Sequence, residues 1–203
     1  MIKKFEPLLD YDTWILMLSG GADSALILYY LNKIRKDQEL FLFTGVNHND
    51  KNYGRQSQDI ANHLGVENYT HMLFPQTHID GIEKKQRDVE FYEKINCLFD
   101  TENSIFIQGR TKNPENLDGP PERKIPEDKY FYFERHKVYR PFIDVDKIEI
   151  LLEYRKNNLM DMFEKTRSCI SLDTYECNEC FWCNERKLAI DESERIYSQD
   201  ISR

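Results

Sequence analysis

The sequence predicts an α/β fold built on a doubly wound parallel sheet that helices cover. Two observations carry this prediction. Short apolar runs alternate along the chain with segments of helical spacing, and a glycine-rich turn follows the first apolar run. A third observation concerns the C-terminal region, where four of the five cysteines crowd together. In a reducing compartment such crowding indicates a metal rather than disulfides, so we expect a small metal-binding appendage there.

The N-terminal part of the chain alternates strands with helices. Thr13 to Leu18 is a short apolar run that ends at a Ser-Gly-Gly turn, and it predicts the first strand. Ala25 to Asn32 follows with apolar residues on every side, as in a buried helix. Glu39 to Val46 predicts a second buried strand, and Tyr53 to Leu64 a helix that Gly65 ends.

The alternation continues through the middle of the chain. Tyr69 to Phe74 predicts a third strand, and the spacing of apolar residues from Ile82 to Phe99 predicts a helix. Ser104 to Gln108 predicts a fourth strand that ends at Gly109. Because Arg110 to Asp128 holds four prolines and many charges, we expect it to be an exposed loop.

Beyond this loop the pattern is less regular. Tyr130 to Tyr139 is rich in aromatic residues, and its direction in the sheet stays open. Lys147 to Asn157 predicts another helix, and a C-terminal helix is expected from about Asn184 to Ile196.

Composition favours a small-molecule substrate. The net charge of −8 disfavours stable binding to nucleic acid. The longest apolar stretch, Ala25 to Leu31, is far shorter than the ~20 residues that a membrane span needs, and the N-terminus lacks the apolar core of a signal peptide. We therefore expect a cytoplasmic protein that does not bind membranes. Its oligomeric state stays open, with a homodimer as one option.

The turn after the first predicted strand has the properties of a phosphate-binding loop. Gly20 and Gly21 permit a tight turn with inward-facing N–H groups, and Ser19 and Ser24 add hydroxyl donors. The helix that begins near Ser24 directs its positive end toward the ligand. The chain contains neither the P-loop pattern G-x-x-x-x-G-K-[ST] nor the dinucleotide pattern G-x-G-x-x-G.

The segment Ser-Gly-Gly-Ala-Asp-Ser after the first strand resembles the PP-loop of the ATP pyrophosphatases, which cleave ATP to AMP and pyrophosphate. This resemblance implies a fold of the HUP, or adenine nucleotide alpha hydrolase-like, class, with ATP and Mg²⁺ as ligands. By resemblance Asp23 acts near the magnesium ion. The residues it places around the phosphates are Ser19, Gly20, Gly21, Asp23 and Ser24, and the further nucleotide contacts expected in this segment are Leu18, Ala22 and Ala25.

The ends of two other predicted strands should face the same crevice. Gly109 follows the fourth strand, and Arg110 and Lys112 come next. Positive charge placed where the pyrophosphate leaves would stabilise the transition state, so these two cations are candidate catalytic residues. A solvated basic turn is the alternative. Asn47 follows the second strand and is a candidate nucleotide contact.

The cysteines follow the spacing of a metal site. Their pattern, C-x7-C-x2-C-x2-C, supplies four soft ligands, and all four coordination positions of a Zn²⁺ ion would be filled. Such a zinc ion would hold the C-terminal segment together without performing chemistry. An iron–sulfur cluster is the rival interpretation. The expected ligands are Cys169, Cys177, Cys180 and Cys183.

Taken together, the loop and the cysteines resemble the 7-cyano-7-deazaguanine synthase family. Three further segments match that family: Pro141 to Glu149, Thr166 to Cys169, and Cys183 to Lys187. The resemblance implies an ATP-dependent carbon–nitrogen ligase of deazapurine (queuosine) biosynthesis. It adenylates the carboxylate of 7-carboxy-7-deazaguanine and converts it with ammonia to the amide and then to the nitrile. Its two expected parts are an ATP-binding domain over residues 1–165 and a zinc-binding segment over residues 166–203.

Other functions stay open, because the family's Gly-Arg-Asn segment has no counterpart between Phe74 and Asp100, unless Gly109-Arg110 is its displaced remnant. One alternative is a sulfur-transfer enzyme that modifies tRNA, although the acidic charge disfavours it. Another is a non-catalytic nucleotide-binding module that a zinc ion stabilises. A third is a ligase that acts on a different acceptor.

Overall fold

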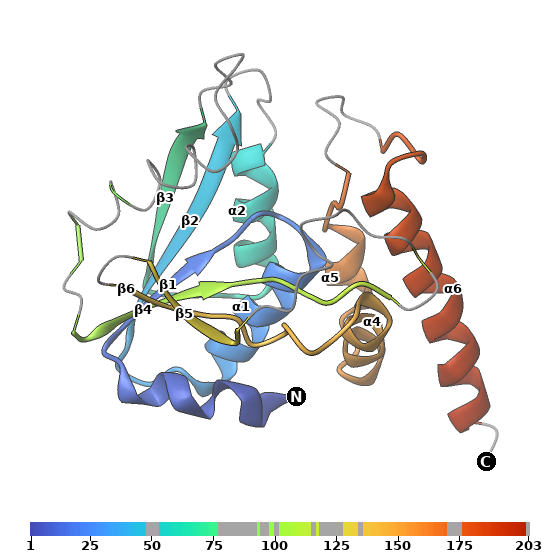
Figure 1. The fold of residues 1–203 in the computed structure, drawn as a ribbon, viewed down its shortest axis with the longest axis horizontal. Helices are drawn as coiled ribbons and strands as arrows, with labels where there is room; N and C mark the ends of the chain where they lie inside the picture. The colour runs from blue at the N-terminus through green and yellow to red at the C-terminus, as the bar shows by residue number, and fades with distance from the viewer. Residues whose placement is uncertain are drawn as a thin grey trace.

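The computed structural model describes residues 1–47, 53–76, 93, 98–99, 102–114, 117, 128–133, 136–169 and 176–201. The strands among them form a six-stranded sheet in the order β3-β2-β1-β4-β6-β5 (Figure 1). Strand β1 (Thr13–Met17) lies between β2 (Glu39–Asn47) and β4 (Ser104–Gln108), and β3 (Tyr69–Gln76) pairs with β2. All three pairings are parallel. The predicted α/β fold with a mostly parallel sheet is confirmed.

The segment whose direction the sequence left open forms a hairpin. Strand β5 (Tyr130–Phe133) pairs antiparallel with β6 (His136–Tyr139). Strand β6 is parallel to β4, where Phe106 pairs with Val138. The hairpin therefore adds one antiparallel strand at the edge of an otherwise parallel sheet, an arrangement common in large mixed sheets.

The helices lie close to the predicted positions, but α1 and α6 begin three residues earlier than predicted, and α6 ends at Ile201 rather than at about Ile196. Helix α1 begins at Ala22 rather than Ala25, and α6 begins at Phe181 rather than Asn184, so α6 includes Cys183. Two short elements were not predicted, η1 and α5. The bounds are η1 (Ile2–Asp10), α1 (Ala22–Ile34), α2 (Tyr53–His63), α4 (Lys147–Lys156), α5 (Met160–Glu164) and α6 (Phe181–Ile201).

Two sequence predictions fall largely outside the described residues. The helix expected over Ile82 to Phe99 is described only at Glu93, which is helical, and at residues 98 and 99. Most of the loop expected over Arg110 to Asp128 also lies outside them.

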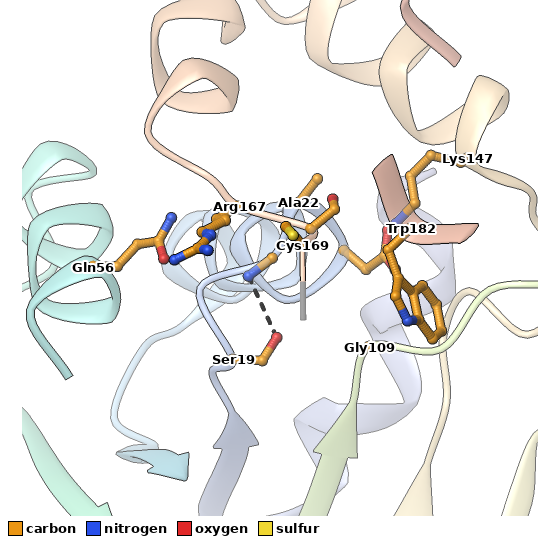
Figure 2. A pocket seen from close by; sticks show the side chains of 11 residues that line it. Ser19, Ala22, Gln56, Gly109, Lys147, Arg167, Cys169 and Trp182 are labelled. Carbon is orange, nitrogen blue, oxygen red and sulfur yellow. Dashed lines mark hydrogen bonds and ion pairs between the residues drawn. The ribbon is translucent and has the colours of Figure 1, made fainter. Parts of the chain in front are cut away.

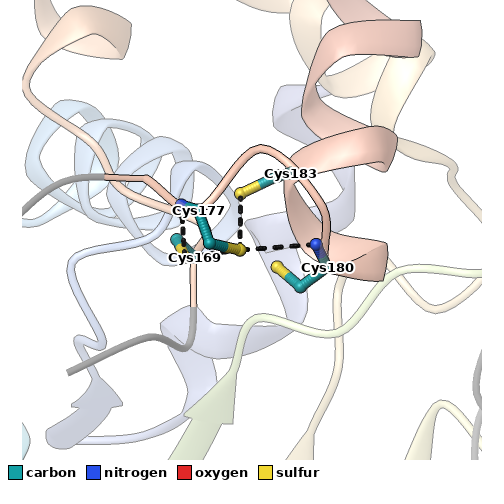
Figure 3. Close-up of side chains that lie close together, drawn as sticks. All are labelled: Cys169, Cys177, Cys180 and Cys183. Carbon is teal, nitrogen blue, oxygen red and sulfur yellow. Dashed lines mark hydrogen bonds between the residues drawn. The ribbon is translucent and has the colours of Figure 1, made fainter. Parts of the chain in front are cut away.

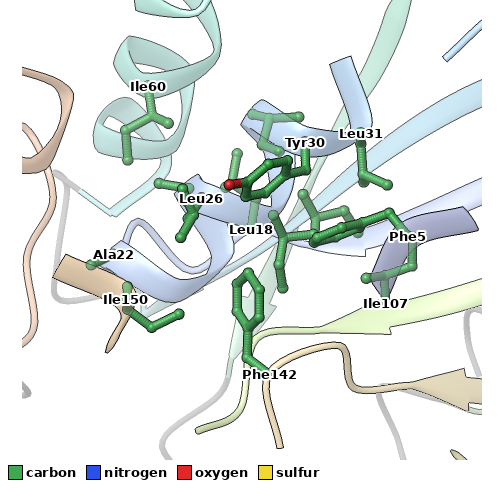
Figure 4. Close-up of a cluster of buried hydrophobic side chains, with 14 of the residues drawn as sticks. Phe5, Leu18, Ala22, Leu26, Tyr30, Leu31, Ile60, Ile107, Phe142 and Ile150 are labelled. Carbon is green, nitrogen blue, oxygen red and sulfur yellow. The ribbon is translucent and has the colours of Figure 1, made fainter. Parts of the chain in front are cut away.

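The core lies on both faces of the sheet, as the alternation in β1 requires. Trp14 and Leu16 pack with α1, η1 and α4 in the larger cluster, whereas Ile15 packs in a second cluster on the opposite face. In the larger cluster Phe5 of η1 stacks on Tyr30 with ring centroids 5.0 Å apart (Figure 4). The fully buried Phe5 explains why the N-terminal segment folds against α1.

Helix α6 packs along α4 at one end of the molecule (Figure 1). Arg155 of α4 donates a 3.1 Å hydrogen bond from Nε to the hydroxyl of Ser193, which is fully buried. These contacts cross the predicted boundary at residues 165 and 166, and that division stays a prediction. Within the described part of the chain, no helix is long and apolar enough to cross a membrane.

Candidate functional site

The glycine loop joins β1 to α1 at the carboxyl end of the sheet. Gly20 has φ +81°, in the left-handed region where other residues are strained, and a Cβ there would lie 3.2 Å from the Gln56 side chain. Gly21 is the N-cap residue of α1 and forms no side-chain capping hydrogen bond. The first N–H groups of α1 are therefore available to an anion, and the helix dipole favours negative charge there.

The two serines shape this loop from within. Ser24 is almost fully buried, and its hydroxyl donates a 3.1 Å hydrogen bond to the Gly21 carbonyl. The Ser19 amide donates to the same Ser24 hydroxyl over 3.3 Å, and the two hydroxyl oxygens lie 3.2 Å apart. Ser24 therefore holds the turn closed, while Ser19 lines the space above it.

A cavity of about 250 Å³ opens above the loop (Figure 2). It lies where β1 and β4 end and α1 begins, which is the usual ligand position in an open α/β sheet. The lining residues are Ser19, Gly21, Ala22, Asp23, Gln56, Gly109, Lys147, Arg167, Ser168, Cys169 and Trp182.

Four of the nucleotide contacts predicted in the loop segment do not line this cavity: Leu18, Gly20, Ser24 and Ala25. Leu18 and Ala25 are fully buried, and Ser24 forms the internal hydrogen bonds of the loop. The Leu18 carbonyl accepts hydrogen bonds from the hydroxyls of Thr44 at 2.8 Å and Ser57 at 3.0 Å. These contacts fix the end of β1 and thereby the position of the glycine loop.

An ion pair joins two helix N-termini beside the cavity. Lys147 Nζ lies 2.5 Å from Asp23 Oδ1, and the two side chains are 7% and 16% exposed. Lys147 is the first residue of α4, whose start is set by a capping box between Asp146 and Glu149. The pair is neutral as a whole and two carboxylates cap α4, so the positive end of α1 and the Arg167 side chain make the cavity favourable to anions.

Gly109 allows β4 to end against the start of α1. A Cβ at this position would lie 2.9 Å from the Ser24 amide nitrogen and 3.2 Å from Asp23 Cβ. Glycine is therefore required here by close approach, with the backbone of α1 as the obstacle. Its position beside Asp23 agrees with the prediction that the fourth strand ends in the crevice.

The other candidates after the strands lie differently. Lys112 is exposed, its ammonium 3.8 Å from Glu149 Oε2, and its amide donates to the Val145 carbonyl. Arg110 is partly buried. Neither belongs to the cavity lining drawn from the described residues, and their catalytic role stays a prediction. Asn47 ends β2, but its side chain lies outside the described part of the chain.

A segment from far along the chain forms one wall of the cavity. The Arg167 amide donates a 3.0 Å hydrogen bond to the Gly20 carbonyl, and Gln56 Nε2 donates to the Lys165 carbonyl at 2.9 Å. The sequence had pointed to this region only through the family-like Thr166 to Cys169 match. It had given no role to Gln56, Lys147, Arg167, Ser168 or Trp182, all of which line the cavity.

The four cysteines come together as predicted (Figure 3). Their sulfur atoms all lie within 4.8 Å of one another, and Cys177 Sγ lies 3.5 Å from Cys169 Sγ and 3.9 Å from Cys183 Sγ. Zn–S bonds of ~2.3 Å in a tetrahedron require sulfur atoms roughly 3.8 Å apart. The cluster is thus able to bind a single tetrahedral metal ion.

The thiols differ in how readily they ionise. Backbone N–H groups of Glu179 and Cys180 that face the Cys177 sulfur, together with Cys169, lower the pKa of Cys177 to about 6. Burial raises the pKa of Cys183 to about 12. A metal ion binds thiolates, so Cys177 offers the first anionic ligand near neutral pH, and metal binding must displace the proton of the buried Cys183 thiol into solvent.

The metal cluster and the cavity share a residue. Cys169 lies in the cavity wall and in the four-sulfur cluster, and Trp182, between Cys180 and Cys183, also lines the cavity (Figure 2). The sequence predicted a zinc ion that holds the C-terminal segment together. The structure adds that the cluster borders the place where a ligand would bind.

Comparison with known proteins supports the fold. No family model matches the chain, and no curated protein matches its sequence. Among solved structures, an NH3-dependent NAD synthetase from Campylobacter jejuni is similar, with TM-score 0.52 and 16% identity over 80% of this chain and 76% of that one. The U34-tRNA thiolase NcsA from Methanococcus maripaludis, solved with its [4Fe-4S] cluster, also has TM-score 0.52 and 16% identity, over 98% of this chain and 72% of that one. The chain thus shares its α/β fold, with a mostly parallel sheet, with these two structures.

Proposed function

We propose that this chain is an ATP-dependent ligase that adenylates a carboxylate and lets ammonia replace AMP. The observation that carries the proposal is the cavity above the glycine loop, where the open N-terminus of α1 meets Asp23, Lys147 and Arg167. The fold supports ATP as the ligand, since one similar structure is an NH3-dependent NAD synthetase.

The chemistry requires activation because a carboxylate does not react with ammonia until one oxygen becomes a good leaving group. A carboxylate oxygen attacks the α-phosphorus of ATP, the bond from phosphorus to the bridging oxygen breaks, and pyrophosphate leaves. Ammonia then attacks the acyl carbon, AMP leaves with the bonding electrons, and a proton passes to solvent. Binding both reactants in one cavity supplies the orientation that the reaction needs.

The residues of the cavity have separate tasks in this proposal. The first N–H groups of α1 bind phosphate oxygens, and Arg167 offsets the negative charge that develops on the leaving pyrophosphate. Lys147 neutralises Asp23, so that this carboxylate does not repel the phosphates. Mg²⁺ would supply further charge neutralisation beside the Asp23 carboxylate. Arg110 and Lys112 would act on the pyrophosphate from the next loop.

For the acceptor we propose 7-carboxy-7-deazaguanine, on the strength of the family resemblance in the glycine loop and the cysteine pattern. Two rounds of ATP cleavage would then convert the acid to the amide and the amide to the nitrile, each releasing AMP and pyrophosphate. Trp182 offers a planar aromatic surface in the cavity wall against which a deazapurine ring can stack.

For the metal we propose Zn²⁺, bound by Cys169, Cys177, Cys180 and Cys183. The sulfur separations of 3.5 and 3.9 Å suit one ion in a tetrahedral site. A [4Fe–4S] cluster places four irons among its thiolates, so it needs the sulfur atoms farther apart. The zinc ion would stabilise the C-terminal segment, residues 166–203, against residues 1–165.

The test is to incubate the protein with ATP and Mg²⁺, with and without 7-carboxy-7-deazaguanine plus ammonium, and to separate the nucleotides by chromatography. Mass spectrometry then gives the masses of the deazapurine products. We expect AMP that depends on the acceptor, together with the masses of the amide and nitrile. Asp23→Asn should abolish AMP formation. If AMP forms without any deazapurine product, the proposed ATP cleavage stands and 7-carboxy-7-deazaguanine is refuted as the acceptor. If no AMP forms with any carboxylate, the chain is a non-catalytic nucleotide-binding module.

A second candidate is sulfur transfer to tRNA. Two observations favour it: Cys169 lies in the cavity wall, and the similar thiolase structure covers 98% of this chain. The short sulfur separations and the net charge of −8 oppose it. An iron chromophore in the purified protein and incorporation of sulfur into tRNA would support this candidate over the ligase.

A further inference from the structure

We propose that Arg186 is a positioning residue that couples metal binding at the four cysteines to nucleotide binding at the glycine loop. The inference rests on the proposed function in one respect, that MgATP occupies the cavity. It goes beyond that function by assigning a role to a residue that does not line the cavity and by predicting a reciprocal energetic link between two sites.

The buried guanidinium of Arg186 joins helix α6 to the end of α5 and to the residues that follow it. Arg186 is 9% exposed, and its Nη1 donates a 2.9 Å hydrogen bond to the Thr166 hydroxyl while Nη2 donates a 3.0 Å bond to the Phe163 carbonyl. The guanidinium also lies 3.8 Å from the centre of the Phe163 ring. Such a planar group with two directed donors restrains the residues that follow α5 much more tightly than a single bond would.

The residues that Arg186 restrains form the wall of the cavity. Thr166 is followed directly by Arg167, whose amide donates to the Gly20 carbonyl at 3.0 Å. Lys165, on the other side of Thr166, accepts a 2.9 Å hydrogen bond from Gln56. Because both neighbours of Thr166 bind the glycine loop or α2, a shift of Thr166 moves the phosphate-binding surface.

Arg186 also responds to the metal cluster. It lies on α6 one turn after Cys183, and its Nε is 3.8 Å from a carboxylate oxygen of Glu176, which precedes Cys177. Cys169 lies two positions after Arg167 in the wall segment. A metal ion that draws these cysteines together therefore brings α6, Glu176 and the wall segment into one arrangement around Arg186.

Thermodynamic linkage makes this arrangement testable. If metal binding orders the wall, MgATP binds more tightly to the metal-loaded protein, and MgATP must raise metal affinity by the same factor. The expected factor is about fivefold or more, the lower end of typical coupling between sites. Loss of Arg186 should make the MgATP affinity independent of the metal and the metal affinity independent of MgATP. A general loss of both affinities would not be enough.

The experiment measures both sides of the cycle on the full chain under reducing conditions. Calorimetry gives the MgATP affinity of metal-free and zinc-loaded protein, and competition with a chromophoric chelator gives the zinc affinity with and without MgATP, corrected for zinc bound by ATP itself. In wild type we expect the two factors to agree. In Arg186→Gln the factor should fall to about one. Thr166→Val removes one acceptor of Arg186 and the hydroxyl's own hydrogen bond to the Phe163 carbonyl, and it should reduce the factor partly.

Arg195→Gln serves as the matched control, because Arg195 lies on the same helix but forms an exposed ion pair with Glu192. It should keep the wild-type factor. Arg186→Lys retains the charge without the two directed donors and should leave the factor low. Should Arg186→Gln not fold, Thr166→Val and the wild-type cycle still decide the question.

The outcomes separate the two proposals. A wild-type protein that binds MgATP equally well with and without zinc would overturn the coupling while leaving the nucleotide site intact. An Arg186→Gln variant with weaker affinities but an unchanged factor would show a merely structural residue and overturn its positioning role. No MgATP binding in either metal state would overturn the proposed function and this inference together.

Discussion

The ammonium of Lys147 lies 2.5 Å from the Asp23 carboxylate, so the first turns of α4 and α1 meet through an ion pair beside the cavity. The two residues are 124 positions apart in the sequence. Because Lys147 is almost fully buried, the pair is expected to be screened little by salt and to keep its geometry.

Removal of the Lys147 charge should weaken nucleotide binding. In Lys147→Gln the Asp23 carboxylate keeps its negative charge beside the phosphate-binding turn, and we expect MgATP affinity to fall about tenfold or more, equivalent to ~1.4 kcal/mol. Calorimetric titration measures the loss. Lys156→Gln, on the same helix but 75% exposed, is the control and should bind normally. Equal affinities in the two variants would contradict the role of Lys147.

A methyl group at Gly109 should disrupt the nucleotide site. In Gly109→Ala the new Cβ meets the Ser24 amide nitrogen at 2.9 Å, so the start of α1 must shift and MgATP binding should be lost. Gly65→Ala is the matched control: its φ of +58° strains alanine by about 1–2 kcal/mol, but no atom lies within 4 Å of its Cβ. That variant should lose stability in urea unfolding and keep its MgATP affinity, and a parallel loss of binding would argue against a specific effect at Gly109.

The cysteine cluster should bind one metal ion per chain. Elemental analysis of the purified protein is expected to find zinc in a one-to-one ratio, without the visible absorption of an iron–sulfur cluster. Cys180→Ser should lose the metal and lower the melting temperature, since metal binding contributes to folding. Cys97→Ser, at the one cysteine of the sequence that does not belong to the C-x7-C-x2-C-x2-C pattern, should retain the metal. Stoichiometric iron and sulfide instead of zinc would refute the single-ion site.

Trp182 should report ligand binding by fluorescence. Of the two tryptophans, Trp14 is fully buried in the core while Trp182 lines the cavity. MgATP should therefore change the emission of the wild-type protein, and Trp182→Phe should abolish this change. Trp14 remains in that variant as an internal reference. A ligand-dependent signal of unchanged size in Trp182→Phe would place the ligand elsewhere.

Stability should decrease in mild acid because of His71. Burial lowers the pKa of this imidazole below its usual value of 6.5, and its ring nitrogens lie 2.9 Å from the Thr44 hydroxyl and 3.0 Å from Gln58 Oε1. The folded state disfavours the protonated ring, so this contribution is fully present above the unfolded pKa and is lost as the pH falls through the folded pKa. Urea unfolding at pH 7.5 and pH 5.5 should show a smaller difference in His71→Gln than in wild type. An identical difference in both proteins would rule out His71 as the cause.

Much of this protein could be predicted from local patterns in its sequence. Period-two and fully apolar runs indicated the strands, because backbone geometry imposes those periods wherever one or both faces are buried. The glycine loop was also predictable. Glycine adopts a left-handed φ without strain, as Gly20 does here, and a Ser-Gly-Gly sequence after an apolar run is typical of a tight turn. The short spacing of the last three cysteines indicated a metal site, because ligands that are close along the chain can reach the same ion.

The tertiary structure alone decided which distant residues meet. Nothing local marks Lys147 as the partner of Asp23, Arg167 as the partner of Gly20, or Cys169 as a residue of both the cavity and the metal cluster. These contacts depend on strand order, on the docking of α4 and α6, and on the direction of the β5–β6 hairpin. Such choices arise from packing over the whole core, where many weak contacts are optimised together, so no single segment of sequence encodes them.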